Sequence, residues 1–158
     1  MTEKPIAVAA AAVAPRATQS RYPADLAVKV AGREKRVLGD LFGLASFGVN
    51  LTTLKPGAQS SLRHAHFVQD EFIYVLAGTP TLLTDAGETP LAPGMCAGFK
   101  GGSGDAHCLV NRGTEDAVVL EVGDRLPGDG ARYPDDDLAV VMGADGVYRY
   151  SRRDGTPI

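Results

Sequence analysis

The sequence predicts an all-β domain of the sandwich or barrel type, and three observations lead to this fold class. Strand-like segments separated by turn residues recur about every eight to twelve residues from residue 47 onward. The 158 residues include 19 glycines and 10 prolines, which disfavour long helices and favour tight turns. No internal segment has the apolar periodicity of a helix longer than two turns. The apolar fraction of 44% is enough for a folded core, which excludes global disorder.

The first part of the chain has weaker signals. Residues 1–20 form an alanine-rich arm, which we expect to be flexible or to lie over a partner subunit. An apolar run at 6–14 has the length of a signal-peptide core, but it lacks leucine and a positively charged start, which disfavours secretion. We expect an extended segment at 22–30 and a charged turn at 32–36. Residues 21–158 then form one domain.

The strands follow in order. Phe47–Leu54 is the first strong strand, and the Lys-Pro-Gly turn at 55–57 ends it. Glu71–Ala77 is rich in aromatic and β-branched residues, which favour strands. Thr81–Thr84 leads into a hairpin turn at 85–87, where glycine tolerates a positive φ. The other predicted strands are 64–67, 95–99, 107–111 and 117–122, and a last hairpin is expected around 144–146. The core of the domain therefore spans about 47–123, and 124–158 is a C-terminal extension.

Composition also limits the function. The net charge is −3, with 16 basic and 19 acidic residues, which disfavours nucleic-acid binding. No apolar run approaches the roughly 20 residues that span a bilayer, so no membrane association is expected. The two cysteines, Cys96 and Cys108, form neither a disulfide framework nor a Cys-x-x-Cys metal site. We interpret both as small buried residues of a cytoplasmic protein.

The chain has three histidines, and their spacing suggests a metal site. His64 and His66 are two residues apart in an extended segment, so their imidazoles lie on the same face. Glu71 opens the next strand, and His107 follows a glycine-rich loop. Three imidazoles and one carboxylate suit a transition metal such as iron, manganese, nickel, copper or zinc, and they leave coordination positions open. A single histidine in a strand is more often a core or surface residue, but here no histidine lies outside the set.

These residues carry a resemblance to the cupin superfamily. Gly57, His64-x-His66, Glu71 and Gly78 resemble the first cupin motif, although Gly57 is one residue further from His64 than usual. Three features resemble the second cupin motif: Gly94, Gly102 and His107-x-x-x-Asn111. Lys100 replaces its usual proline, and the loop before His107 is two residues longer. The segments FGVNLTTLKPG, DEFIYVLAG and GDRLPGD extend the likeness to small single-domain bacterial cupins, from about residue 20 to the end.

The resemblance implies a double-stranded β-helix, that is, a jelly-roll (RmlC-like) barrel, preceded here by the extended arm. It also implies that His64, His66, Glu71 and His107 bind one divalent transition metal, namely Fe, Mn, Zn or Ni. It says little about the substrate.

Strand alternation predicts the neighbours of the metal. Ile73 and Val75 share the inward face with Glu71. Phe72, Tyr74 and Leu76 then point outward and supply an apolar stripe through which two copies could pair as a homodimer. The candidates for contact with a substrate are Lys100, on a glycine-rich loop at 100–106 that could act as a lid, and the amide of Asn111. Solvent exposure of Lys100 and a turn-closing role of Asn111 are the alternative interpretations.

The function that the sequence favours is a metal-dependent enzyme acting on a small polar molecule. Because metal-bound water is the only clear base, oxygen chemistry of the dioxygenase type is slightly favoured. One alternative is a metal-dependent isomerase or lyase acting on a sugar or sugar-phosphate-like substrate. Another is a non-catalytic module that binds a metal or small molecule, such as a sensor. A metal-free barrel is disfavoured, because it leaves all three histidines unexplained.

Overall fold

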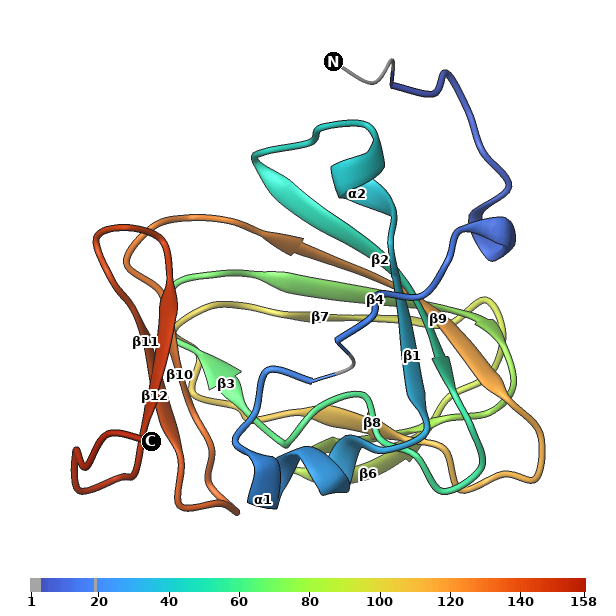
Figure 1. Ribbon diagram of the computed structural model, residues 1–158. Coiled ribbons are helices and arrows are strands. Elements are labelled where there is room, and N and C mark those ends of the chain that lie inside the picture. The colour runs from blue at the N-terminus through green and yellow to red at the C-terminus, as the bar shows by residue number, and fades with distance from the viewer. Residues whose placement is uncertain (1–3, 19) are drawn as a thin grey trace.

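A computed structural model describes residues 4–18 and 20–158, and it consists mostly of strands (Figure 1). The expectations for residues 1–3 and 19 of the arm fall outside these residues. The helical elements are short: η1 (Ala10–Ala12), α1 (Ala24–Ala27), η2 (Val28–Val30) and α2 (Leu38–Leu41). Within the described part of the chain, no helix is long and apolar enough to cross a membrane.

The strands of the described residues are β1 (Arg33–Val37), β2 (Phe47–Leu54), β3 (Ala65–His66), β4 (Glu71–Ala77), β5 (Thr81–Thr84), β6 (Gly87–Pro90), β7 (Cys96–Phe99), β8 (Cys108–Val110), β9 (Ala117–Asp124), β10 (Gly130–Arg132), β11 (Ala139–Met142) and β12 (Tyr148–Ser151). They form a five-stranded sheet in the order β1-β2-β9-β4-β7, a four-stranded sheet β12-β11-β10-β3 and a three-stranded sheet β6-β5-β8.

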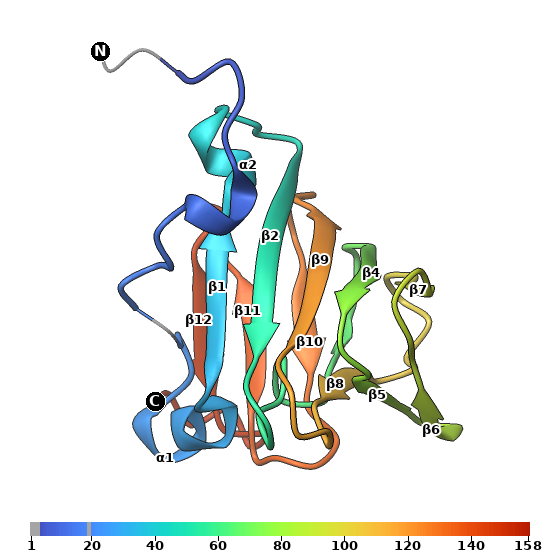
Figure 2. The same ribbon diagram turned by 90° about the vertical axis from the view of Figure 1, so that its right-hand side faces the viewer.

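The two smaller sheets act as one wall of a barrel. An antiparallel bridge between His64 and His107 connects the segment before β3 to the segment before β8. The five-stranded sheet forms the other wall, and Figure 2 shows its strands side by side from β1 to β7. The predicted double-stranded β-helix is therefore confirmed.

Two hydrophobic clusters fill part of the barrel. The larger one packs the five-stranded sheet against β5 and β8, and it includes Ile73 and Val75, as strand alternation predicts. The outward-facing residues of β4 are exposed: Phe72 (42%), Tyr74 (39%) and Leu76 (48%). The smaller cluster lies between the start of the domain and the β10–β12 sheet. A cavity remains between the two walls, beside these clusters.

The predicted charged turn at 32–36 is wrong, because this segment is strand β1. It pairs with β2 from Arg33 opposite Leu54 to Val37 opposite Asn50. Arg33, Lys35 and Val37 line the cavity, so the inward face of the strand is largely polar. This segment therefore lacks the alternation of apolar and polar residues by which strands are recognised in a sequence.

Two further expectations are corrected. Residues 24–30 are helical rather than extended. Leu26 and Val30 are four residues apart and so lie on one helical face, which is buried in the interior; their side chains are 8% and 3% exposed. Cys108 is buried as predicted, but Cys96 is exposed on β7. Both cysteines are free.

Gly78 sits at a tight contact that a side chain would break. Its φ is +74°, and a Cβ atom there would lie 2.6 Å from the Asp116 carbonyl oxygen and 2.7 Å from the Ala117 Cα. We expect Gly78→Ala to lower the free energy of unfolding by about 2–4 kcal/mol through backbone strain and overpacking. Gly57→Ala is the matched control, since Gly57 also has a positive φ of +82° but open space around it. Urea unfolding should show a loss of only about 1–2 kcal/mol for the control, and equal losses would contradict the packing argument.

Candidate metal centre

The bridge between His64 and His107 determines the position of the site. The His64 N–H donates to the His107 carbonyl (3.1 Å), and the His107 N–H donates to the His64 carbonyl (2.8 Å). Residues that pair directly across antiparallel strands place their side chains on the same face. The two imidazole rings consequently lie 5.0 Å apart between their centroids. Two segments more than forty residues apart in sequence thus meet at one point.

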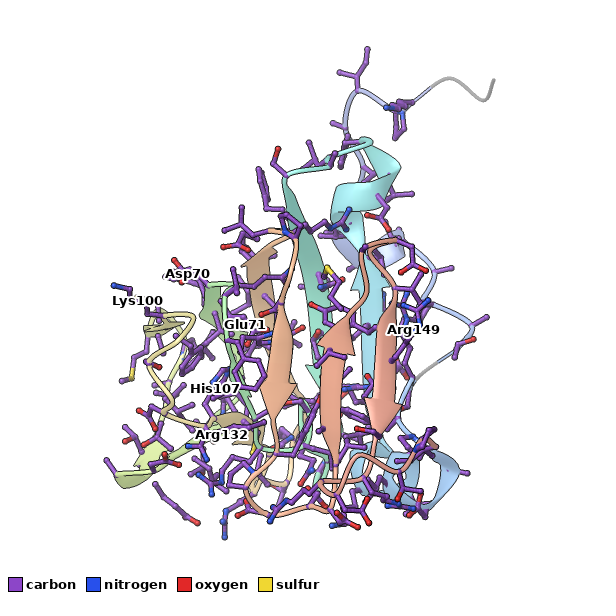
Figure 3. The ribbon with its side chains drawn as sticks, turned by 90° about the vertical axis from the view of Figure 1, so that its left-hand side faces the viewer. Asp70, Glu71, Lys100, His107, Arg132 and Arg149 are labelled. Carbon is purple, nitrogen blue, oxygen red and sulfur yellow. The ribbon has the colours of Figure 1, made fainter. Side chains whose placement is uncertain are left out.

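His66 and Glu71 complete the cluster. His66 follows His64 by two residues and points to the same side, with ring centroids 4.9 Å apart. Glu71 is the first residue of β4, on the opposite wall, and reaches across toward the imidazoles, as Figure 3 shows for Glu71 and His107. The Glu71 Oε2 atom lies 2.9 Å from the Nε2 of His107, 3.4 Å from that of His64 and 3.7 Å from that of His66.

The hydrogen bonds of two imidazoles fix which nitrogen faces Glu71. The Nδ1 of His64 lies 2.9 Å from the Leu62 carbonyl oxygen, which can only accept, so Nδ1 carries the proton. The Nδ1 of His66 is 2.6 Å from the carboxylate of Asp129 and donates in the same way. In the neutral tautomers, the unprotonated Nε2 atoms then face the carboxylate oxygen of Glu71.

This arrangement fits a metal ion. Donor atoms of His64, His66 and Glu71 all lie within 4.8 Å of one another. Glu71 Oε2 is buried and has no hydrogen-bond partner among the described residues. Lone pairs of nitrogen and oxygen that face one another in a buried site repel unless a cation lies between them. Imidazole nitrogens together with one carboxylate oxygen are ligands that first-row transition metals accept.

The charges of the cluster are tightly coupled. Burial alone would raise the pKa of Glu71, but the imidazoles of His107 and His64 hold it well below its usual range. Burial alone would lower the pKa of His66, yet Asp129 and Glu71 raise it. For His107, burial outweighs Glu71 and lowers the pKa. Glu71 is therefore an anion when the protein is folded at neutral pH, as a metal ligand must be.

Asp129 holds His66 in place from outside the cluster. Its buried carboxylate accepts from His66 Nδ1 and from the Tyr148 hydroxyl (2.8 Å) through Oδ2, and from the backbone N–H groups of Val68 and Gln69 through Oδ1. Burial alone would raise the pKa of Asp129, but the bonds from His66 and Tyr148 lower it. A carboxylate that accepts from a ligating histidine fixes the ring orientation and makes it a better ligand.

A cavity of about 770 Å³ opens from the cluster toward the arm and β1. Polar side chains of Glu121 and Lys35 line its wall on the five-stranded sheet. The Glu121 Oε2 atom accepts from Lys35 Nζ at 2.6 Å and from Thr52 Oγ1 at 2.9 Å. The ring of Phe99 stacks on that of His107, with centroids 3.5 Å apart.

The two candidates for contact with a substrate lie away from this cavity. Lys100 is exposed and points away from Glu71 and His107 (Figure 3). Its loop is tied to the barrel, since Gly102 N–H donates to the His66 carbonyl at 2.9 Å. Asn111 is fully buried, and its amide donates to the carbonyls of Leu54 and Glu115 and accepts from the Gly113 N–H. Its amide groups therefore hold the turn after β8.

Several residues of the site escape a sequence-based search. Asp129 and Tyr148 belong to the C-terminal extension. Asp129 ends the segment GDRLPGD, which carries part of the family likeness but gives the residue no role, and no quoted motif contains Tyr148. In β1, Arg33 and Lys35 are two residues apart, and this spacing could have predicted a polar strand face toward a cavity. Glu121 points inward because it pairs with Ile73 across β4 and β9, a register that is not readable from the sequence.

Comparisons with known proteins identify the family to which this chain belongs. The Cupin domain family model matches residues 50–123. A crystal structure from Silicibacter pomeroyi, named a sugar phosphate isomerase from a cupin superfamily, is 46% identical, with a TM-score of 0.83 over 88% of each chain. The chain is a cupin. A second structure, from Acidithiobacillus ferrooxidans and provisionally named a sugar phosphate isomerase, is 32% identical, with a TM-score of 0.72 over 80% of each chain.

More distant likenesses add only the fold. The polyketide cyclase RemF from Streptomyces resistomycificus is 21% identical to this cupin, with a TM-score of 0.62 over 75% of this chain and 78% of that chain. Among curated proteins, none matches.

Removal of the Asp129 charge should weaken metal binding without breaking the fold. We expect Asp129→Asn to lower the affinity for Zn²⁺ by about 10–100-fold, because the amide no longer orients and polarises His66. Competition with a chromophoric chelator measures this affinity. Tyr148→Phe removes one hydrogen bond to Asp129 and should cause a smaller loss. Asp145→Asn is the control, because Asp145 pairs with Arg149 on an exposed hairpin. Unchanged Zn²⁺ affinity in a folded Asp129→Asn variant would refute the positioning role.

Proposed function

We propose that this cupin is a metal-dependent isomerase that acts on a small phosphorylated sugar. The observation that carries the proposal is the convergence of imidazole nitrogens on the buried Oε2 of Glu71, at the inner end of a polar cavity. The names of the two similar structures at 46% and 32% identity support the same class of substrate.

The metal would be held by His64, His66 and Glu71, with His107 as the fourth ligand. His107 approaches the same Glu71 oxygen as the other imidazoles and lies on the opposite side of the bridge from His64. A bound divalent ion would polarise a carbonyl or hydroxyl oxygen of the substrate, which makes the neighbouring C–H more acidic. Iron, manganese, nickel and zinc all accept this donor set.

The carboxylate of Glu121 favours isomerisation over oxygen chemistry. The sequence favoured a dioxygenase because it offered no base other than metal-bound water. Besides Glu71, Asp40 and Asp124, the cavity is lined by the carboxylate of Glu121, which pairs with Ile73, two residues from Glu71, in the β4–β9 register. Interconversion of an aldose and a ketose moves one proton between adjacent carbons and another between the oxygens they carry, and a fixed carboxylate suits the transfer between the carbons. We assign this transfer to Glu121 Oε1, while Lys35 and Thr52 hold Oε2.

The remaining walls suit a substrate with several hydroxyl groups. Asn50, Ser60, Gln69 and Tyr150 line the same cavity and offer donors and acceptors around it. Such groups bind a polyhydroxylated chain and exclude an apolar one, because buried polar groups without partners are costly. The polar lining thus supports a sugar rather than an aromatic or aliphatic substrate.

The experiment is an anaerobic and aerobic assay of the metal-loaded protein against aldose and ketose phosphates of three to six carbons. Interconversion that proceeds equally without oxygen is the expected result. Turnover that requires and consumes oxygen would instead identify a dioxygenase. Elemental analysis runs in parallel, and a wild type that binds no metal would refute the site itself.

Two variants separate metal binding from proton transfer. Glu71→Gln should lose the metal and all turnover, since a ligand is removed. Glu121→Gln should retain the metal but lower kcat by about 10²–10⁴-fold, because the amide cannot accept a proton. Glu115→Gln, at an exposed turn, is the control and should match the wild type. Full activity of Glu121→Gln would exclude it as the base.

We also propose that two copies pair through the exposed stripe of Phe72, Tyr74 and Leu76 on β4. About 40–50% of each of these side chains is exposed, and they stand on one face of one strand. Exposed apolar patches of this kind commonly mark contact surfaces. Multi-angle light scattering should give a dimer mass for the wild type and a monomer mass for Leu76→Lys. A monomeric wild type would refute the pairing.

A further inference from the structure

The arm and β1 bring an unusual group of positive charges into the cavity. Arg16 and Arg21 come from the arm, and Arg33 and Lys35 come from β1; all four line the same cavity as His64 and His66. Of the acidic residues that line the cavity, Glu121 is the one that acts on Arg16 and Arg33, and its Oε2 is bonded to Lys35; Asp40 is paired with Arg125. Four cations around the one carboxylate of Glu121 give this part of the cavity an excess of positive charge.

The arrangement of these residues is held by contacts at both ends. The Arg16 N–H donates to the Lys35 carbonyl at 2.9 Å, which fastens the arm to β1. Figures 1 and 2 show the arm running alongside β1 before it reaches α1. Tyr22, just after Arg21, packs edge-to-face against Tyr133 and Tyr150, with ring centroids 5.9 and 6.0 Å apart.

Burial and neighbouring charges disfavour the charged forms of two of these arginines. Burial, and then the charges of Arg33 and Arg21, lower the pKa of Arg16, while Glu121 acts in the opposite direction. Burial likewise lowers the pKa of Arg33. Like charges gathered in a half-buried cavity repel one another, and a bound anion relieves that repulsion.

The group lies within reach of the metal cluster. Arg33 Nη1 donates to the Ser60 carbonyl at 2.5 Å. The next residue, Ser61, has its hydroxyl 3.3 Å from His64 Nδ1. Neighbouring residues of one segment, Ser60 and Ser61, therefore contact Arg33 and a metal-cluster imidazole, and both parts line the same cavity.

We propose that Arg16, Arg21 and Arg33 form the subsite for the phosphate group of the substrate, and that the N-terminal arm is therefore part of the binding site. Guanidinium groups match phosphate oxygens with paired N–H donors and stay charged at any physiological pH. This inference rests on the proposed isomerase and specifies which part of the chain holds the phosphate. Several guanidinium groups favour a phosphate dianion over a carboxylate.

The test uses inorganic phosphate as the probe, titrated into the full chain at constant ionic strength and followed by calorimetry. The Glu71→Gln protein serves as the background, so that phosphate does not bind at a metal. We expect saturable binding that weakens at least 10-fold in Arg16→Gln/Arg21→Gln. The control, Arg112→Gln/Arg149→Gln, removes two charges from exposed ion pairs elsewhere and should change the affinity less than 2-fold.

Three further measurements complete the test. Thermal melting checks the fold of each variant, and the single variants Arg16→Gln and Arg21→Gln replace the double variant if it does not fold. Acetate should bind at least 10-fold more weakly than phosphate, and equal binding would overturn the assignment to phosphate. Absence of saturable phosphate binding, or equal affinity in all variants, would overturn the subsite even if isomerase activity is found. Binding as expected without isomerase activity would overturn the proposed function alone.

Discussion

The antiparallel pairing of His64 with His107 is the interaction on which the rest of the structure depends. It joins the two smaller sheets into one wall and puts two imidazoles on the same face of that wall. Because residues opposite each other in a ladder share a face, a shift of one residue would turn one ring out of the barrel. The bridge is thus both the closure of the fold and the base of the candidate metal centre.

The cluster also depends on residues that are not among its proposed metal ligands. His64 is oriented by the Leu62 carbonyl, and His66 by the carboxylate of Asp129. Asp129 comes from the C-terminal extension, next to β10, and Tyr148 of β12 donates to it. The extension is therefore connected to the site by hydrogen bonds as well as by sheet pairing, and its role goes beyond covering the barrel.

The proposed chemistry divides the cavity between its two walls. The imidazoles belong to the wall that contains β3 and β8, and Glu71 reaches them from β4. Glu121 stands beside Glu71 on the five-stranded sheet, held by Lys35 and Thr52. The arm then adds guanidinium groups at the open side. Each part comes from a different segment of the chain. A substrate can therefore contact all of them only in the folded barrel.

The sequence by itself determined the all-β fold, the closeness of His64 to His66 and the inward direction of Ile73 and Val75. These follow from the period of two along a strand and from turn chemistry, which act between near neighbours in the chain. Only the tertiary structure decided that Asp129 and Tyr148 support His66, that Glu121 faces the cavity and that β1 is a strand. These facts depend on the register between distant segments. That register is set by the packing of the whole barrel, and no local pattern encodes it.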